Sequence, residues 1–548
     1  MLAEGPSLAM TRHRFPVSPP DGFLIALDAF MRRTGQGFHA SQSVLELDRV
    51  PDVNQLRAAT RRIVEKHPLL VATLRRSWLT LRPYWEVPKT HDRRLPLGVW
   101  REDGSPGALG AEAVVVENPK KFLTDKIQPP YDVDTDTNAE RRHANARLDV
   151  LELRDGRCRV AFSWYHILMD GKGAELLLAE LARLCEGVDL DCEAPDAVQI
   201  KVTFWEKFRL AGRAAQRMAA LANLGVRSLS GPKPRAGRCC YEAITLNAAD
   251  SAVVRARAEA LTGTLFPLSF YLAGVMRAHN AVFSLRQIVP RNFVAAVPMQ
   301  MRRRGARGPI FNNHMTILFF SALQEELADF ESAAVALKRQ FLEMMRQRLD
   351  ASFAAILEMM LRAPSRLFMK IVRLQFGGEI STFFHSHTGA FAPDMVTFAG
   401  ARIENANHLP CLGAPPGTGI FFADRGAHVN ITLSWREGCL SAEERRVMAD
   451  VLLEDLLGEP ARIYCRRLPP LRTLLSLERP WFENHRDHWF RTGWVCPCHL
   501  VGGTGTPSGA LRRGTAARPP CRRIPRSCGC ADLAAARSGG TGRRYRGP

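Results

Sequence analysis

The residues with the clearest chemical potential in this sequence are His166, Asp170 and Gly171, which lie within one short segment. An imidazole titrates near neutral pH, so it can take a proton from a hydroxyl or amine that attacks an acyl carbonyl. An Asp four residues later can reach back within the same turn, or pair with a distant arginine that braces it. Gly171 permits a backbone geometry that a side chain would forbid. The pattern predicts a general base at His166; the alternative is a turn histidine followed by an Asp helix cap.

The pattern on either side predicts the elements that must position His166. Residues 158–164 alternate as a strand does, and residues 174–184 carry apolar side chains at helical spacing. The expected order is strand, histidine-containing turn, helix. Earlier in the chain, Asp52 can cap a helix with one apolar face between residues 56 and 64. That helix should end at His67-Pro68, because proline disfavours helical geometry in the residue before it.

The remaining pattern mixes strands and helices, which predicts an α/β fold. Strands are expected at residues 69–74, 84–87, 240–246, 293–298, 315–320 and 428–435. Helices are expected at residues 252–261, between residues 323 and about 368, and after Ser441, which stands at capping-box spacing from Glu444. A basic amphipathic run, Lys201–Leu229, precedes a break at Gly231–Pro234 that makes a plausible crossover between lobes.

Length and composition exclude several classes of protein. A chain of 548 residues at 46% hydrophobic can form more than one domain or one two-lobed fold. No apolar run approaches the ~20 residues that span a bilayer, and the N-terminus lacks the apolar centre of a signal peptide. Thirteen cysteines without framework spacing favour free thiols, so a cytoplasmic location is expected. Neither G-x-x-x-x-G-K-[ST] nor G-x-S-x-G occurs, which removes the main argument for nucleotide hydrolysis and serine-hydrolase chemistry.

The net charge of +20 is unevenly distributed. Residues 480–548 hold twelve arginines against three acids, a surplus of nine. Their Gly, Pro and Arg content cannot bury enough surface to offset chain entropy, which predicts disorder. The cysteine and histidine spacings in this tail match no strong zinc pattern, so no metal site is expected. The modest remaining charge suits an enzyme that handles phosphorylated or carboxylated ligands, without a nucleic-acid partner.

Together these segments resemble the chloramphenicol-acetyltransferase-like superfamily, which contains CoA-dependent acyltransferases, wax-ester and alcohol acyltransferases, and condensation domains of peptide synthetases. Residues 165–171 look like its H-H-x-x-x-D-G signature, with Tyr165 in place of the first His. Further similar segments follow in the family's order over about residues 15–460. They are residues 65–70 (R-H-P-x-L), 82–85, 297–303 (V-P-x-x-x-R), 311–313 (G-N), 385–389 (S-N-x-G), and the closing strand and helix at 431–435 and 441–458. The family's D-F-G-W-G-type motif is absent.

The resemblance implies a two-lobed α/β sandwich with a central tunnel, in which His166 is reached from both faces. It also implies that Asp170 is structural and pairs with an arginine of the second lobe, for which Arg302 and Arg303 are the candidates. Tyr165, Ser386 and Thr388 are candidate substrate-binding residues. The two hydroxyl groups could donate to the oxyanion of a tetrahedral intermediate, or they could simply satisfy a loop.

The function predicted from this resemblance is a monomeric acyltransferase that moves an acyl group from a CoA thioester to an alcohol or amine. Acyl-CoA would be a co-substrate, and no cofactor would be bound tightly. Two alternatives stay open. One is a free-standing condensation-type domain whose donor is held by an acyl-carrier protein. The other is a catalytically silent binding protein on the same scaffold.

The expected organisation places this chemistry between two lobes. Its parts are a flexible N-terminus (1–14), an N-terminal lobe (15–230), a crossover (231–239), a C-terminal lobe (240–479) and a disordered basic tail (480–548). The amphipathic run within the N-terminal lobe could lie peripherally on a membrane surface, or it could be a lobe-packing helix with a solvated basic face.

Overall fold

The computed structural model describes residues 14–87, 94–101, 144–188, 202–264, 266–303 and 305–458. The chain divides into two units, residues 1–480 and 481–548, and every described residue lies in the first. The tail expected to be disordered, and all of the expected flexible N-terminus except Arg14, lie outside the described residues. The described part forms two six-stranded sheets and one three-stranded sheet.

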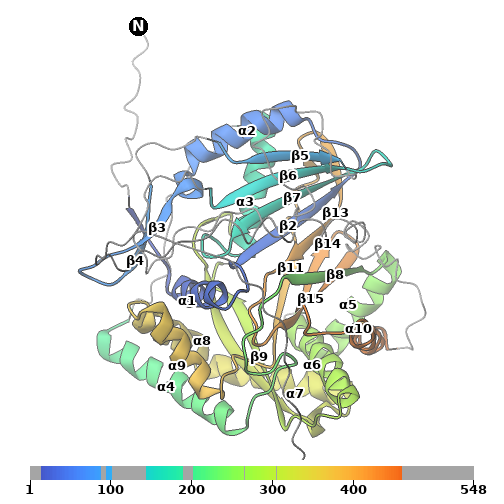
Figure 1. Cartoon of the computed structure of the whole chain (residues 1–548). Coiled ribbons are helices and arrows are strands. Elements are labelled where there is room, and N and C mark those ends of the chain that lie inside the picture. The colour runs from blue at the N-terminus through green and yellow to red at the C-terminus, as the bar shows by residue number, and fades with distance from the viewer. Residues whose placement is uncertain are drawn as a thin grey trace, which may run out of the picture. The chain divides into compact units, whose positions relative to one another are not determined.

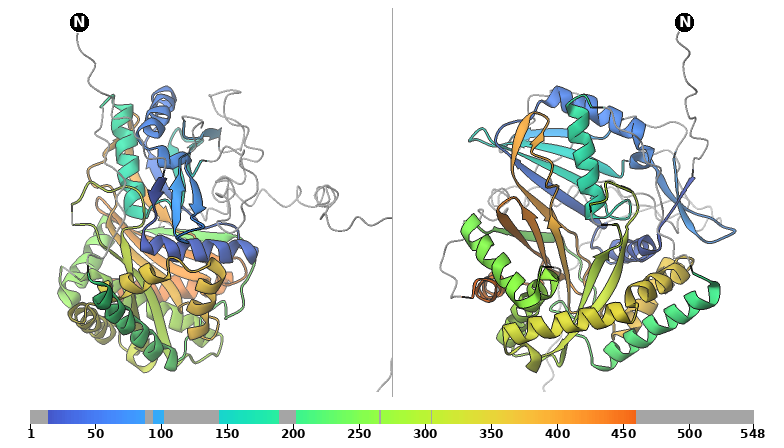
Figure 2. Two further views of the ribbon diagram at one scale, coloured as in Figure 1. Left: turned by 90° about the vertical axis from the view of Figure 1, so that its left-hand side faces the viewer. Right: turned by 180° about the vertical axis from the view of Figure 1, so that it is seen from behind.

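The first six-stranded sheet contains the strand that leads to His166. In order across the sheet, its strands are β12 (Thr397–Phe398), β13 (Ala401–Leu409), β2 (Ala40–Leu47), β7 (Cys158–Tyr165), β6 (Ala146–Glu152) and β5 (Leu97–Arg101). Helices α2 (Val53–Lys66) and α3 (Gly171–Cys185) pack against each other along this sheet (Figures 1 and 2). All but one of the residues of β7 are buried, as expected of a strand covered on both faces.

The second six-stranded sheet forms the other side of the described molecule. In order, its strands are β10 (Met315–Leu323), β9 (Asn292–Gln300), β11 (Phe383–Ala390), β14 (Thr418–Arg425), β15 (His428–Arg436) and β8 (Cys239–Thr245). One group of helices consists of α5 (Ala248–Thr262), α6 (Pro267–Leu285), α7 (Phe330–Arg346) and α10 (Ala442–Leu457). A second group consists of α4 (Phe204–Asn223), α8 (Leu349–Met360) and α9 (Ser365–Gln375) (Figure 1).

The chain passes between the two six-stranded sheets more than once. Strand β13 follows β11 of the second sheet in sequence, yet it pairs with β2 of the first sheet. The chain then returns to the second sheet at β14. The first sheet is therefore completed by residues from the C-terminal half of the sequence. The division into lobes at residues 231–239 stays a prediction.

Helix α1 (Pro19–Arg33) is an element that the sequence pattern did not predict. Every residue from Pro19 to Met31 is buried, so the helix shows none of the polar face by which surface helices are identified. Its start is fixed by a capping box between Ser18 and Asp21 and by proline in the first turn. The helix packs against α8 and α9 and lies between them and the first sheet (Figure 1).

Several predicted element boundaries are confirmed, and one predicted strand is wrong. Asp52 caps α2 by accepting hydrogen bonds from two backbone N–H groups, and Ser441 forms the predicted capping box with Glu444 at the start of α10. The strand expected at residues 69–74 is instead a 3-10 turn, η1 (Pro68–Val71), followed by β3 (Thr73–Arg76). The turn forms because Pro68 has a fixed φ suited to the first position of a helix. The third sheet has the order β1 (Arg14–Pro16), β4 (Pro83–Glu86) and β3.

The basic amphipathic run forms helix α4. Leu210 and Ala211 pack against Ala355 of α8, as a lobe-packing helix would. At its start, Phe204, Trp205 and Phe208 are 70%, 76% and 58% exposed. Contact of these aromatic rings with a membrane surface stays a prediction. Among the described helices, none is both long enough and apolar enough to cross a membrane.

Candidate active site

His166 occupies the turn between β7, which ends at Tyr165, and α3, which begins at Gly171. The backbone N–H and the backbone carbonyl of His166 both form hydrogen bonds. Its N–H donates to the carbonyl of His39 at 3.0 Å, and its carbonyl accepts from the Asn313 side-chain amide at 2.8 Å. The imidazole is partly exposed and lines a cavity. The fixed backbone therefore presents the ring to a space that a reactant can enter.

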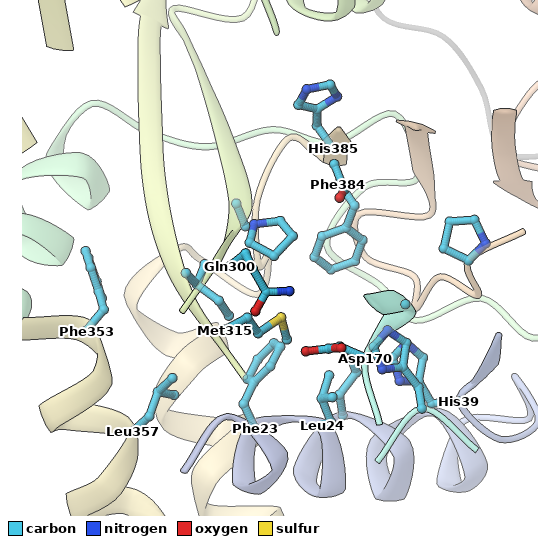
Figure 3. A pocket seen from close by; sticks show the side chains of 18 of the residues that line it. Phe23, Leu24, His39, Asp170, Gln300, Met315, Phe353, Leu357, Phe384 and His385 are labelled. Carbon is cyan, nitrogen blue, oxygen red and sulfur yellow. The ribbon is translucent and has the colours of Figure 1, made fainter. Parts of the chain in front are cut away.

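The cavity has a volume of about 440 Å³, which lies in the usual range for small-molecule sites. Elements of both six-stranded sheets line it. His39, His166, His408 and Cys411 come from segments around the first sheet, and Gln300, Met315 and Ser386 come from the second. Figure 3 shows His39 and Asp170 at one side of this space and Phe353 and Leu357 at the other. The predicted base thus lies where the two halves of the described molecule meet.

His39 stacks on His166, an arrangement that the sequence did not predict. The two rings are 4.9 Å apart between centroids and nearly parallel, at 7°. The backbone N–H of His39 donates to Asp28 Oδ1 at 2.7 Å, and its Nε2 lies 3.2 Å from the carbonyl oxygen of Cys411. Strand β2 pairs antiparallel with β7, so that Ala40 faces Tyr165 and His39 is brought beside His166. Only the pairing register, and no local motif, could have indicated this neighbour.

Burial favours the neutral form of three histidines at the cavity, His39, His166 and His408. It lowers the pKa of His166, and the nearby charge of Asp170 offsets this only in part. The pKa of His39 is well below its usual value, first through burial and then through the charge that His166 would carry. Burial likewise lowers the pKa of His408 to about 3. A neutral imidazole can accept a proton, so His166 is in the form that a general base requires at neutral pH.

Asp170 joins the two halves of the site. Its carboxylate caps α3 by accepting the Gly173 N–H at 2.8 Å, and it accepts the His314 N–H at 2.9 Å. Arg302 Nη1 donates to both carboxylate oxygens, at 2.6 and 2.9 Å, and the side chains of Arg302 and Asp170 are 2% and 9% exposed. Among the described residues, no hydrogen bond joins Asp170 to the His166 ring. Asp170 is therefore placed to hold the structure together.

Of the two candidate arginines, the structure pairs Arg302 with Asp170. Arg302 Nε also donates to the carbonyl of Pro309 at 2.8 Å, which fixes the loop that leads back to β10. Arg303 is exposed and lies at the cavity, and among the described residues no hydrogen bond or ion pair joins it to Asp170. Its position suits contact with a ligand better than a structural pairing.

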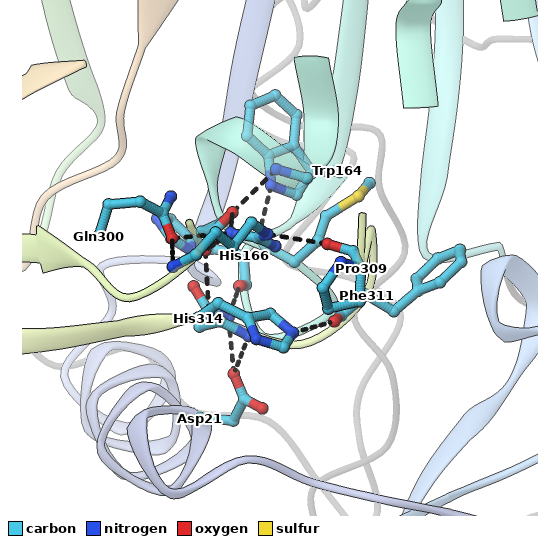
Figure 4. A network of polar contacts seen from close by, with 12 residues as sticks. Asp21, Trp164, His166, Gln300, Pro309, Phe311 and His314 are labelled. Carbon is cyan, nitrogen blue, oxygen red and sulfur yellow. Dashed lines mark hydrogen bonds and ion pairs between the residues drawn. The ribbon is translucent and has the colours of Figure 1, made fainter. Parts of the chain in front are cut away.

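A second series of hydrogen bonds, from Asp21 through Asn313, holds the His166 end of the turn. Asp21 Oδ1 accepts from the backbone N–H of Asn313 at 3.0 Å and from its side-chain amide at 2.7 Å, and that amide also donates to the His166 carbonyl. Burial raises the pKa of Asp21 to about 8. The sequence contained a signal for this residue, because Ser18 and Asp21 stand at capping spacing before an apolar run. Figure 4 shows Asp21, His314 and His166 within this network.

Tyr165 is not among the described residues that line the cavity, so the geometry lends its predicted role in substrate binding no support. It is 1% exposed, and its hydroxyl donates to Asp28 Oδ2 at 2.9 Å. Neighbouring residues at the end of a strand point in opposite directions, so a turn that presents His166 to the cavity directs Tyr165 away from it. Asp28 of α1 thus anchors both Tyr165 and the backbone of His39. Tyr165 takes part in positioning the turn.

Ser386 and Thr388 both lie at the cavity, but only Ser386 remains a candidate donor. In β11, Phe384, Ser386 and Thr388 share one face of the strand. The Thr388 hydroxyl donates to the carbonyl of Phe422 at 3.2 Å, and a hydroxyl has one proton to donate. The Thr388 hydroxyl therefore forms a hydrogen bond within the sheet, to the neighbouring strand β14. Ser386 lies at the cavity and remains the candidate hydrogen-bond donor to the oxyanion.

The backbone conformation does not require glycine at residue 171, and the constraint in this turn is a steric one at Gly173. Gly171 does not have a positive φ, and a Cβ there would lie 3.5 Å from the His408 ring, an ordinary contact. A Cβ at Gly173 would lie 2.1 Å from the carbonyl oxygen of Ile310. The first turn of α3 can therefore approach the loop before β10 only because residue 173 has no side chain.

Comparison with solved structures identifies the fold. The chain is similar to the trichothecene 15-O-acetyltransferase TRI3 from Fusarium sporotrichioides, with 13% identity, a TM-score of 0.57, and coverage of 83% of this chain and 97% of that one. It is similar to the first condensation domain of the calcium-dependent antibiotic synthetase in complex with a substrate analogue, with 17% identity, a TM-score of 0.57, and coverage of 82% and 97%. It is also similar to F. sporotrichioides TRI101 complexed with coenzyme A and T-2, with 12% identity, a TM-score of 0.51, and coverage of 80% and 97%.

No family model matches the sequence, and a search of curated proteins finds no match either. The structural likeness confirms the fold that the sequence resemblance predicted. The described chain has the two-lobed α/β fold of these acetyltransferases and condensation domains.

The two glycines of the turn give a matched pair of variants. Gly173→Ala should destabilise the protein by about 1–3 kcal/mol, because the added methyl group forces the Ile310 carbonyl to move. Gly171→Ala should change stability by less than about 0.5 kcal/mol, since its methyl group meets only van der Waals contact. Urea unfolding followed by circular dichroism measures both. Equal effects of the two substitutions would contradict the close approach at Gly173.

The Asp170–Arg302 pair should behave as one energetic unit. Asp170→Asn and Arg302→Met should each destabilise the protein by about 3–5 kcal/mol, because each leaves a buried polar group without its partner. In the double variant, the loss should be smaller than the sum of the two single losses by about 0.5–3 kcal/mol. Urea unfolding of the four proteins measures this coupling. Additive losses would show that the two side chains act independently.

Proposed function

We propose that this chain, which has the fold of condensation domains and CoA-dependent acyltransferases, transfers an acyl group from a CoA thioester to an alcohol or amine, with His166 as the general base. The observation that carries the proposal is the placement of His166. Its neutral, partly exposed ring lines a cavity shared by both sheets, and its backbone is held at both polar groups.

The proposed reaction is a direct transfer. The acceptor O–H or N–H gives its proton to the His166 imidazole while the acceptor atom attacks the thioester carbonyl. The tetrahedral intermediate then collapses, the carbon–sulfur bond breaks, and the imidazolium returns the proton to the departing thiolate. Ser386, on the cavity face of β11, is the proposed donor to the oxyanion. Asp170 and Arg302 hold the turn and take no part in proton transfer.

Cationic groups near the cavity fit an anionic donor. Arg303 lies exposed at the cavity and is the cation best placed to meet such a donor, whereas Lys172 and Arg302, which also line it, are paired with Glu175 and Asp170. One of the similar proteins was crystallised with coenzyme A, which suggests the same co-substrate here. The monomeric state and the cytoplasmic location stay predictions, as does the absence of a tightly bound cofactor.

A second candidate function is condensation with a carrier-bound donor. Its support is that condensation domains of synthetases have this fold and are similar to the chain over more than 80% of its length. The chemistry at His166 would be the same, and only the group that presents the thioester would differ. An assay that offers the same acyl group on CoA and on acyl-carrier protein would separate the two functions.

Replacing the base should abolish turnover while the fold remains. His166→Ala should lower kcat about 10²–10⁴-fold, since the acceptor then loses its proton without a positioned base. Thiol release from a panel of acyl-CoAs with several alcohols and amines measures the rate, and thermal unfolding checks the fold. His428→Ala, at a histidine outside the cavity, is the matched control and should leave the rate unchanged.

Turnover retained without His166 would refute the assignment. Tight acyl-CoA binding by the unmodified protein without any turnover would establish the silent-binding alternative.

The pH dependence should reflect the lowered pKa of His166. A base must be deprotonated to act, so a lower pKa moves the acid limb of kcat/KM to lower pH. We expect the midpoint of this acid limb to lie below the ordinary histidine value of about 6.5. Steady-state rates over pH 5–8.5 measure this. A midpoint at or above pH 6.5 would mean that the active group is not the His166 imidazole.

A further inference from the structure

The cavity continues beyond His166 between two helices that carry apolar stripes. On α8, the residues that line it have the spacing i, i+3, i+4, i+7, which places them on one helix face. They are Phe353, Ile356, Leu357 and Met360. On α9, Phe368, Ile371, Val372 and Gln375 line it with the same spacing, and only Gln375 is polar. The face that α8 directs toward this open space is therefore apolar, and the face of α9 is apolar except at its last residue.

The facing wall is formed by alternate residues of β9 and β10. Along β10, buried residues alternate with partly exposed ones, and the partly exposed Met315, Ile317 and Phe319 line the cavity. A strand face in contact with water would normally carry polar side chains. Opposite Ile317 and Phe319, the paired β9 residues are Pro298 and Ala296, which also line the cavity. These small side chains leave room between the sheet and the helices.

The helices and strands that wall this space contribute two polar side chains to it, Gln300 of β9 and Gln375 of α9. Gln300, registered opposite Met315, lies at the end near Asp170, and Figure 3 shows Phe353 and Leu357 on the far side. Between these ends, the lining that α8 and β10 contribute is entirely apolar. A sugar or a polyamine would lose its hydrogen bonds to water there without replacement. Burial of apolar surface is the interaction that such walls offer.

We infer that this chamber, formed by α8, α9, β9 and β10, receives an unbranched aliphatic chain whose reactive end lies at His166. The inference rests on the proposed function for the reaction at that end, but not for the binding of the chain. Phe353 and Met360 stand seven positions apart on α8, which at 1.5 Å rise per residue gives a wall of about 10 Å and suits a chain of on the order of eight to twelve carbons. The acyl donor or the acceptor alcohol could carry the chain, and the two sources share this chemistry.

Two series of substrates test the inference and identify the source. The first pairs acyl-CoAs of two to fourteen carbons with a fixed short alcohol, and the second pairs acetyl-CoA with alcohols of the same lengths. In the series whose chain enters the chamber, kcat/KM should rise about fourfold per added methylene and then level off. A rise in the first series assigns the chain to the donor, and a rise in the second assigns it to the acceptor. Flat profiles in both series would overturn the inference.

A pair of variants on α9 tests the location. Val372 lines the chamber, and Leu374, two residues later, is 74% exposed and does not line it. Val372→Trp should lower the ratio of ten-carbon to two-carbon kcat/KM at least tenfold, whereas Leu374→Trp should leave the ratio unchanged. If Val372→Trp fails to fold, Ile356→Phe on α8 tests the same wall. An unchanged ratio in a folded chamber variant would overturn the inference.

A binding measurement separates this inference from the proposed function. Fluorescence of cis-parinaric acid, competed by dodecanol, reports chain binding without any transfer reaction. His166→Ala should bind the probe as the unmodified protein does, and Val372→Trp should bind it at least tenfold more weakly. Probe binding without turnover would contradict the proposed acyl transfer, while the inference that the chamber binds an aliphatic chain would stand. Absence of binding in the unmodified protein would reject the chamber, whatever the enzyme assay shows.

Discussion

Asp170 has three structural roles at once, and the site depends on their coincidence. Its carboxylate caps the first turn of α3, accepts the His314 N–H ahead of β10, and pairs with Arg302 after β9. An ion pair buried to this degree gains little over an apolar pair of the same shape, because both charges lose their hydration. The Asp170–Arg302 pair instead fixes the relative position of the two side chains, because a structure that left either charge unpaired would lose stability. The turn that carries His166 is thereby tied to the second sheet at its C-terminal end, while Asn313 and Asp21 tie it at the histidine itself.

The electrostatics around His166 follow from this construction. Three histidines, His39, His166 and His408, lie close together, and a charge on one disfavours a charge on the next. With burial lowering the pKa of each, the group is neutral as a whole. The stacked His39 ring also covers one face of the His166 imidazole, which lines the open cavity. Helix α1 makes this possible, because Asp28 holds His39 and Tyr165 from behind.

The sequence predicted the parts of this arrangement that have local signals. The strand–turn–helix around His166, the Asp52 and Ser441 caps, and the α/β class all follow from periodicity and capping chemistry over a few residues. The Asp170–Arg302 pair came from the family resemblance, as local spacing contains no information on a partner 132 residues away. His39 and α1 were missed for different reasons. His39 depends on strand register, and α1 is buried on all sides, so it lacks the periodic polar face that identifies a helix. Gly173 was missed because its neighbour, the Ile310 carbonyl, is brought to it only by the folded loop.

Two hydrophobic cores meet in the described molecule, and α8 belongs to both: Leu357 packs in the core of the first sheet and Phe353 in that of the second. The cavity lies along the seam between these cores. Protein interiors are otherwise filled as closely as organic crystals, so an unfilled seam means that atoms on its walls lack contacts they would gain from an occupant. Filling the seam with larger side chains would increase packing but would bury His166 without access. The cavity along this seam has apolar walls, and ion pairs close its polar end. It therefore favours a ligand with one polar, reactive end and an apolar remainder.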